Sequence, residues 1–228
     1  YEDRLSHSVY VKYSLLDDPA KLDPILRGRK VSVLIWTTTP WTLPASMAVA
    51  FHPKFTYFAV TDSQGDVLLV ESRRHKSVQE ASGLALTDVL TRIPGKKLDR
   101  LRFKHPFLER EVLGVLATYV TATEGTGCVH TAPGHGREDF ETGTRYGIEI
   151  HCPVGRAGEF VEGLPEYIGK NVFDANEAII KLLGDRSALV GSAGEVCHSY
   201  PHCWRCHKPV IFRASQQWFI SVDHNKLR

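Results

Sequence analysis

The sequence has few cysteines, one methionine, little net charge and no long apolar run. Its 228 residues include 5 cysteines, and the formal net charge at pH 7 is +2. An odd number of cysteines with one close pair does not fit a secreted disulfide framework, so we expect a reducing compartment, either the cytoplasm or an organelle matrix. The slight charge does not mark a nucleic-acid-binding protein, and the local basic runs are expected to be solvated surface.

Two further absences narrow the class of protein. No stretch approaches the roughly twenty apolar residues of a membrane span, and no signal peptide opens the chain, so we expect a soluble protein without membrane contact. The sole methionine is Met47. Tyr1 is therefore not expected to be a native start, and the chain is expected to be a piece of a larger protein.

What is present is a β-rich pattern. Alternating or β-branched segments predict strands at 9–13, 31–36, 57–61, 67–71, 111–116 and 127–131. Helical patterns are fewer and cover 73–82, 137–146 and 173–183, the last two closed by Gly147 and Gly184. At this length folding buries roughly 70 to 75% of the unfolded surface, so the chain needs no disulfides or metals to be stable. We expect a β-rich α+β fold, with a β-barrel core and helices packed outside it.

The first motif is WTTTPWTLP at residues 36–44. The apolar run before it predicts a strand that ends at Pro40, which places Thr37, Thr38 and Thr39 where side chains leave the core and meet a ligand. Threonine is also simply common in strands. Three in a row favour the ligand interpretation, because alternation directs at least one of them toward a pocket.

The second motif is GTGCVHTAPGHGRED at residues 125–139. Four glycines, a proline, two histidines and a carboxylate within fifteen residues suit a polar pocket better than a packing core, and neither motif contains a phosphate loop. Asp139 falls in the first turn of a predicted helix, where the helix dipole favours the ionised form. An ionised carboxylate is a ligand for an ammonium group, although a first-turn acid can also merely stabilise its helix.

Together the two motifs resemble the editing site of the isoleucyl-tRNA synthetase editing domain, the connective insertion of a class I synthetase. The resemblance covers essentially the whole chain, since the tail segments HSYPHCWRC (198–206) and IFRASQQWFI (211–220) resemble the stretch that returns to the synthetase's catalytic core. Leucyl and valyl enzymes carry related insertions, but theirs have an Arg-Pro pair after the threonines. Here the run continues as Thr39-Pro40-Trp41-Thr42, which is the isoleucyl form.

The resemblance implies a fold and a division of the chain. The fold is a closed β-barrel of about six strands with peripheral helices, as in the valyl, isoleucyl and leucyl editing domains. The implied parts are an entry ribbon from the parent synthetase at 1–14, the editing barrel at 15–195 and a return segment toward the catalytic core at 196–228.

The resemblance also implies roles for the motif residues. Asp139 binds the α-amino group of the mischarged amino acid, and His130 shapes the pocket and rejects a larger side chain. Thr39 belongs to the same catalytic set. The residues expected to bind substrate around them are Thr37, Thr38, Trp41, Thr42 and Ser46.

Three of these residues leave questions open. Trp41 either lines the pocket for the amino-acid side chain or packs in the core. Ser46 stands where the family commonly has asparagine, so it is expected to retune the pocket rim or its tRNA contacts. Cys128 shares a strand face with His130, which suggests a thiol and base pair, but the family usually has an apolar residue there and we expect packing.

The function implied is proofreading of mischarged tRNA. One missing methylene changes binding by only about 1 to 3 kcal/mol, so a site that activates isoleucine needs a second site to remove valine; this pair is the known case of that limit and not a result of this sequence. We expect hydrolysis of Val-tRNA(Ile), and of valyl adenylate as a second substrate, by attack of an oriented water without a cofactor. The expected partners are the acceptor end of tRNA(Ile), the valine moiety and the catalytic domain of an ATP-binding parent, with the protein a monomer. The alternative is a non-catalytic module that binds the tRNA acceptor end or depends on zinc.

A cysteine pair lies outside these motifs. Cys203 and Cys206 have the spacing of half a zinc site, since two thiolates two residues apart can chelate one tetrahedral metal. The other half comes either from nearby side chains or from a pair upstream of Tyr1, and the resemblance favours the latter. We therefore expect zinc in the full-length parent and unmetallated thiols in this chain. The local candidates are Cys197, His198, His202 and His207.

Overall fold

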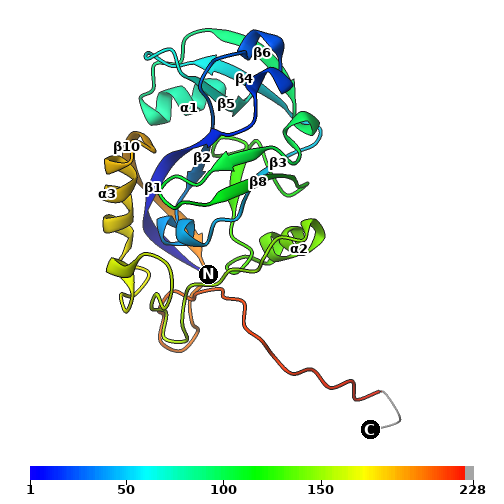
Figure 1. Ribbon diagram of the computed structural model, residues 1–228. Helices are drawn as coiled ribbons and strands as arrows, with labels where there is room; N and C mark the ends of the chain where they lie inside the picture. The colour runs from blue at the N-terminus through cyan, green and yellow to red at the C-terminus, as the bar shows by residue number, and fades with distance from the viewer. Residues whose placement is uncertain (224–228) are drawn as a thin grey trace.

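The computed structural model describes residues 1–223 and is built around one large mixed sheet (Figure 1). Its strands are β1 Glu2–Leu15, β2 Val31–Thr37, β3 Ala48–Phe51, β4 Thr56–Thr61, β5 Val67–Glu71, β6 Val89–Pro94, β7 Arg102–Lys104, β8 Glu111–Leu116, β9 Cys128–Thr131 and β10 Leu189–Tyr200. The helices are α1 His75–Ser82, α2 Arg137–Tyr146 and α3 Asn176–Asp185, with short 3₁₀ turns that include η3 Pro40–Ala45. The prediction of a β-rich fold with few helices is confirmed.

The strands follow the order β6-β4-β5-β2-β1-β7-β8-β3-β9, and β10 pairs with β1 off this path. β2 is parallel to β5 and β3 is parallel to β8, while the other pairs are antiparallel. Within residues 1–223 the terminal strands β6 and β9 are not paired with each other, so the sheet does not close into a barrel. The sheet also has ten strands, where about six were expected.

All six predicted strands are present, and the four that were not predicted have weak sequence signals. β3 and β7 are 4 and 3 residues long, too short to show an alternation. β6 ends in proline and is largely exposed, and β10 contains two glycines. β10 forms through its pairing with β1, a partner some 190 residues away in sequence that no local pattern reveals.

The two halves of β1 pair with different strands. Its first half pairs only with β10, from Glu2 opposite Tyr200 to Ser8 opposite Gly194, and its second half pairs with β2. β1 and β10, which are far apart in sequence, thus form one antiparallel ribbon, and the C-terminal segment continues beyond it away from the body (Figure 1).

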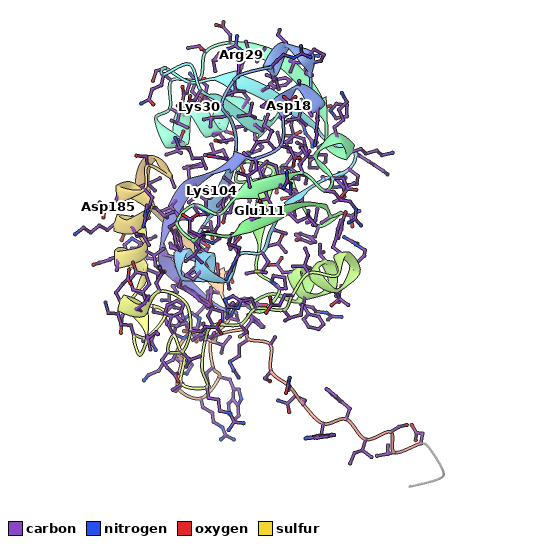
Figure 2. All side chains as sticks on the ribbon, in the orientation of Figure 1. Asp18, Arg29, Lys30, Lys104, Glu111 and Asp185 are labelled. Atoms are coloured by element: carbon purple, nitrogen blue, oxygen red, sulfur yellow. The ribbon has the colours of Figure 1, made fainter. Side chains whose placement is uncertain are left out.

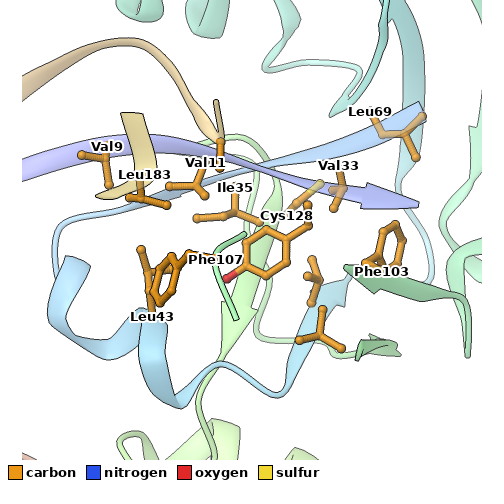
Figure 3. Close-up of a cluster of buried hydrophobic side chains, with 14 of the residues drawn as sticks. Val9, Val11, Val33, Ile35, Leu43, Leu69, Phe103, Phe107, Cys128 and Leu183 are labelled. Atoms are coloured by element: carbon orange, nitrogen blue, oxygen red, sulfur yellow. The ribbon is translucent and has the colours of Figure 1, made fainter. Parts of the chain in front are cut away.

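The core lies where β1, β2, η3 and β9 meet, under α3 (Figure 3). Val11 of β1 lies opposite Ile35 of β2, and Val9 and Val33 belong to the same cluster; each of these four side chains is fully buried. Burying a side chain of this size contributes about 1.5 to 3 kcal/mol, so the β1–β2 pair is a main source of stability. Cys128 lies in the same cluster, as the packing interpretation expects.

Many of the charged side chains lie on the outside of this body (Figure 2). Arg29 and Lys30, from the basic run at 27–30, are exposed, and Lys104 stands opposite Glu111 in the β7–β8 register (Figure 2). None of the helices found in residues 1–223 combines the length and apolar character that a bilayer crossing requires.

The bounds of the three α-helices can be compared with the bounds predicted from the sequence. α2 spans the predicted 137–146, and Gly147 ends it with a left-handed φ of 69°. α1 begins two residues later than predicted, because Glu71 holds the preceding turn by accepting from the Arg73 N–H at 2.9 Å. The prediction that Gly184 closes α3 is wrong: the helix runs to Asp185, and Ser187 takes the left-handed position with a φ of 54°.

Candidate functional site

A cavity of about 320 Å³ lies between the end of β2 and the strand β9. Thr37 closes β2, and Pro40 starts the buried turn η3, so the chain bends at Thr38 and Thr39 and presents their side chains at the sheet edge. The cavity brings together six of the predicted site residues, Thr37, Thr38, Thr39, Thr42, His130 and Asp139.

The threonines form a chain of hydroxyls. The Thr37 Oγ1 accepts from the Thr39 N–H at 3.1 Å and lies 3.3 Å from the Thr39 Oγ1. The Thr42 hydroxyl donates to the Thr39 carbonyl at 2.8 Å and also lies 3.3 Å from the Thr39 Oγ1. Because Thr39 is held from both sides, its hydroxyl has a fixed position at the cavity wall.

His130 stands opposite this chain on β9, buried at 7% exposure. Its Nε2 lies 3.2 Å from the Thr42 Oγ1, and since the Thr42 proton already goes to the Thr39 carbonyl, the imidazole Nε2–H donates. Burial lowers the pKa of His130 to about 4, so the ring is neutral at pH 7. A neutral ring of such low basicity shapes the cavity and is a poor proton acceptor.

Asp139 enters the cavity from the first turn of α2. Its Oδ2 accepts from the Ala132 N–H at 2.9 Å, and its Oδ1 accepts from the Tyr119 hydroxyl at 3.2 Å. Burial raises the pKa of Asp139, and these two hydrogen bonds oppose the rise without cancelling it. The sequence-based expectation considered only the helix dipole, which favours the charged form; burial is the larger effect.

Among residues 1–223 the Asp139 carboxylate forms no ion pair, and its one side-chain hydrogen bond is to the neutral Tyr119. A largely buried carboxylate is stabilised by a positive charge. The cavity therefore offers a binding position for a cationic group, such as an ammonium, next to a wall of hydroxyls.

Two predicted site residues lie outside the cavity lining. Trp41 is 3% exposed and packs edge-to-face against His135 and Phe173, so of the two interpretations the structure places it in the core. Ser46 is fully buried and accepts from the Tyr13 hydroxyl at 3.1 Å, away from the pocket rim where it was expected.

The structure adds lining residues that the sequence reasoning did not select, chiefly Tyr119 and His135. His135 lies within the second motif, and its place between two glycines was a usable signal. Its Nδ1 donates to the Phe212 carbonyl at 2.9 Å, which ties the motif loop to the C-terminal segment. Tyr119 follows β8 in a stretch without any motif, so only the fold identifies it.

Cys128 is not placed to act as a nucleophile. It is 1% exposed in the main core, and burial raises the pKa of its thiol well above the ordinary value. A thiol that stays protonated is a weak nucleophile.

The cysteine pair predicted as half a zinc site lies near the C-terminal end of the described residues. Cys203 and Cys206 lie in a tight turn closed by the Cys203 N–H, which donates to the Lys208 carbonyl at 2.8 Å. The backbone N–H groups of Cys206 and Arg205 lower the pKa of the half-buried Cys203 thiol. Such a turn suits two zinc thiolates. Within residues 1–223, no three His, Cys, Asp or Glu side chains lie close enough to share a metal ion.

Comparison with known proteins gives sequence relatives and fold relatives. No family model matches the chain. It is 48% identical over 228 residues to an isoleucine–tRNA ligase of Geobacter sulfurreducens and 46% identical to one of Desulfotalea psychrophila, and each match covers all of this chain and 24% of the relative. The chain thus spans about a quarter of the length of these relatives.

Solved structures share the fold at low sequence identity. The crystal structure of GlLeuRS-CP1 matches with a TM-score of 0.65 at 15% identity, covering 81% of this chain and 99% of that one. The editing domain of the P. knowlesi cytosolic leucyl-tRNA synthetase matches with a TM-score of 0.63 at 11% identity, covering 84% and 98%. In sequence the chain is a relative of the isoleucine–tRNA ligases along about a quarter of their length, and it shares its fold with leucyl-tRNA synthetase editing domains.

Proposed function

We propose that this chain is the editing domain of an isoleucyl-tRNA synthetase and hydrolyses Val-tRNA(Ile). The observation that carries the proposal is the Asp139 carboxylate, which lies largely buried at a hydroxyl-lined cavity without a cationic partner among the described residues. An aminoacyl ester carries an α-ammonium group next to the carbonyl that reacts. The near-50% identity to isoleucine–tRNA ligases supports the isoleucyl enzyme over its leucyl and valyl relatives.

In the proposed reaction a water attacks the ester carbonyl carbon. The bond between that carbon and the ribose oxygen breaks, the ribose oxygen takes up a proton, and free valine leaves with the oxygen of the water in its carboxylate. Asp139 holds the ammonium, and the fixed Thr39 hydroxyl positions the water or the ester. The ester is labile enough that positioning and polarisation supply the catalysis, so no covalent intermediate or cofactor is needed.

His130 has a separate role in this proposal, which is to limit the size of the amino-acid side chain. Its hydrogen bond to Thr42 fixes the ring, and its low basicity argues against proton transfer. A rigid wall that accepts valine and excludes the extra methylene of isoleucine gives the second sieve that an isoleucine-activating enzyme requires. Valyl adenylate presents the same ammonium and carbonyl, and is proposed as a second substrate.

The same proposal assigns parts and partners. Residues 1–14 and 196–228 connect the editing body at 15–195 to the parent catalytic domain, and the acceptor end of tRNA(Ile) reaches the cavity. Cys203 and Cys206 bind zinc with two further ligands supplied by the parent enzyme. The closed barrel implied by the resemblance would require pairing between β6 and β9, the two terminal strands of the sheet.

The experiment is to incubate Val-tRNA(Ile) with the 228-residue chain and with its Asp139→Ala variant, and to follow release of labelled valine. We expect hydrolysis by the unchanged chain and loss of it in the variant, with matching circular dichroism spectra for the two proteins. Equal hydrolysis by both would refute the role of Asp139. Tight binding of the acceptor end without valine release would identify a non-catalytic module instead.

A further inference from the structure

A second cavity shares its wall with the first. It has a volume of about 310 Å³ and lies between the start of α2 and the segment 212–215. Pro133, Gly134 and Gly136 line it, while the neighbouring Ala132 and His135 of the same loop line the first cavity. The two cavities are therefore separated by a single stretch of backbone, 132–136.

Two aromatic rings flank this second cavity from different elements. Phe140 of α2 is 45% exposed, and Phe212 of the C-terminal segment is 55% exposed. Neither ring contacts another aromatic ring or a cation among the described residues. Single exposed apolar residues are ordinary, but two unpaired rings on either side of one cavity form a surface for a flat apolar ligand.

The segment that carries Phe212 is held in place. Its carbonyl accepts from the His135 Nδ1–H at 2.9 Å, and the Ala214 N–H donates to the Gly134 carbonyl at 2.7 Å. The Arg213 Nε–H donates to the Val154 carbonyl at 3.1 Å. The segment leaves the body on the side where α2 lies (Figure 1). These hydrogen bonds fix the segment, and its Phe212 lines the same cavity as Phe140 of α2.

The charge at the cavity is positive. Arg213 and Arg137 both line it. Arg137 pairs through Nε with Glu141 at 3.1 Å, but its side chain is 87% exposed and its other N–H groups are free to meet an anion. Aromatic faces with arginines beside them are the combination that binds single-stranded nucleic acid, by base stacking and phosphate contact.

We propose that this second cavity binds the base of the penultimate nucleotide of the tRNA 3′ end, a cytidine, while the first cavity takes the terminal aminoacyl-adenosine. The inference rests on the proposed function, since it places one RNA strand across the backbone stretch 132–136. Phe140 and Phe212 stack on the base, and Arg137 and Arg213 face the linking phosphate. The stacking increases affinity for the acceptor end without contributing to the chemistry at Asp139.

The test compares two probes that differ by one nucleoside. Adenosine 5′-monophosphate carries the phosphate without the cytosine, and cytidylyl-(3′→5′)-adenosine carries both. We expect the 228-residue chain to bind the dinucleotide about tenfold more tightly, within the range of one base stacked on an aromatic side chain. Phe140→Ala and Phe212→Ala should each remove most of this advantage and leave the affinity for adenosine 5′-monophosphate unchanged. Phe219→Ala is the matched control, because Phe219 is a 91% exposed phenylalanine of the same segment that does not line the cavity.

Equal affinity of the unchanged chain for both probes would overturn the inference, as would variants that weaken both probes alike. Hydrolysis of the 3′-valyl esters of adenosine and of the dinucleotide forms the second arm. Dinucleotide binding that depends on the two phenylalanines, together with an absence of hydrolysis, would leave the inference standing and refute the proposed function. Loss of the dinucleotide advantage in Phe219→Ala would instead assign the effect to the whole C-terminal segment.

Discussion

Replacement of Asp139 by asparagine separates the charge of this side chain from its hydrogen bonds. The carboxylate accepts from the Ala132 N–H and from the Tyr119 hydroxyl. In Asp139→Asn the amide oxygen keeps the first bond, and the amide N–H donates to the Tyr119 oxygen. The Tyr119 proton then turns to Thr131, whose Oγ1 lies 3.3 Å away. The local geometry is therefore retained, and the negative charge is lost.

The expected effect on activity follows from the bond to the substrate ammonium. A hydrogen bond to a charged group contributes about 1.5 to 3 kcal/mol, which corresponds to a loss of about 10- to 150-fold in kcat/KM. The effect on stability has the opposite sign. Because burial raises the pKa of Asp139, the ionised side chain destabilises the fold at neutral pH, and its removal should leave the Tm unchanged or higher.

The assay pairs valine release from Val-tRNA(Ile) with thermal unfolding at pH 7, for the unchanged chain, Asp139→Asn and Asp139→Ala. We expect slow hydrolysis and an undiminished Tm in Asp139→Asn, together with a lower Tm in Asp139→Ala, which leaves the buried Ala132 N–H without its acceptor. Hydrolysis by Asp139→Asn at the rate of the unchanged chain would refute the ammonium-binding role. A Tm well below that of the unchanged chain would show that the carboxylate is mainly structural.

Four further predictions follow from the same geometry. As the pH is lowered, hydrolysis by the unchanged chain should begin to decline above the ordinary aspartate pKa of 3.8, because the raised pKa of Asp139 means that its carboxylate is protonated at a higher pH. A hydrolysis rate that stays the same down to pH 4 would contradict this. The free energy of unfolding should fall by about 3 kcal/mol as the pH is lowered from 6.5 to 4, because the pKa of His130 is about 4 in the folded chain and higher in the unfolded chain, which therefore binds the proton first. Urea titrations at both pH values measure this loss. His130→Gln should make the free energy of unfolding less dependent on pH. His130→Ala should raise hydrolysis of Ile-tRNA(Ile) about tenfold or more by enlarging the cavity, and unchanged discrimination would assign the size limit elsewhere. Gly127→Ala should destabilise the chain by more than about 1 kcal/mol, since Gly127 has a φ of 72° and an added Cβ would overlap the Glu71 side chain; an unaltered urea midpoint would argue against that packing.

The sequence predicted most of the site because its two motifs are short and local. Thr37, Thr38 and Thr39 end a strong β-branched strand, and Asp139 opens a helix whose bounds were predicted correctly. The fold brings these segments together at one cavity. Trp41 could not be placed from sequence, because a tryptophan beside a pocket and one behind it follow the same pattern.

Other features depend on tertiary contacts that no local pattern encodes. Burial reverses the expected influence of the helix dipole on Asp139, and burial is a property of the folded chain. Tyr119 reaches the site through the turn that follows β8. The strand β10 depends on pairing with the distant β1. The helix α3 continues through Gly184 to Asp185, and Ser187 takes the left-handed position after it.

The central claim is that one cavity removes valine and spares isoleucine. Its most direct test is the ratio of kcat/KM for Val-tRNA(Ile) over Ile-tRNA(Ile), measured with the 228-residue chain under single-turnover conditions. The account predicts a ratio of at least about 10 to 200, the discrimination that one methylene allows in a fitted pocket. A ratio near 1, with both esters hydrolysed, would contradict the size-selective cavity and with it the role assigned to His130.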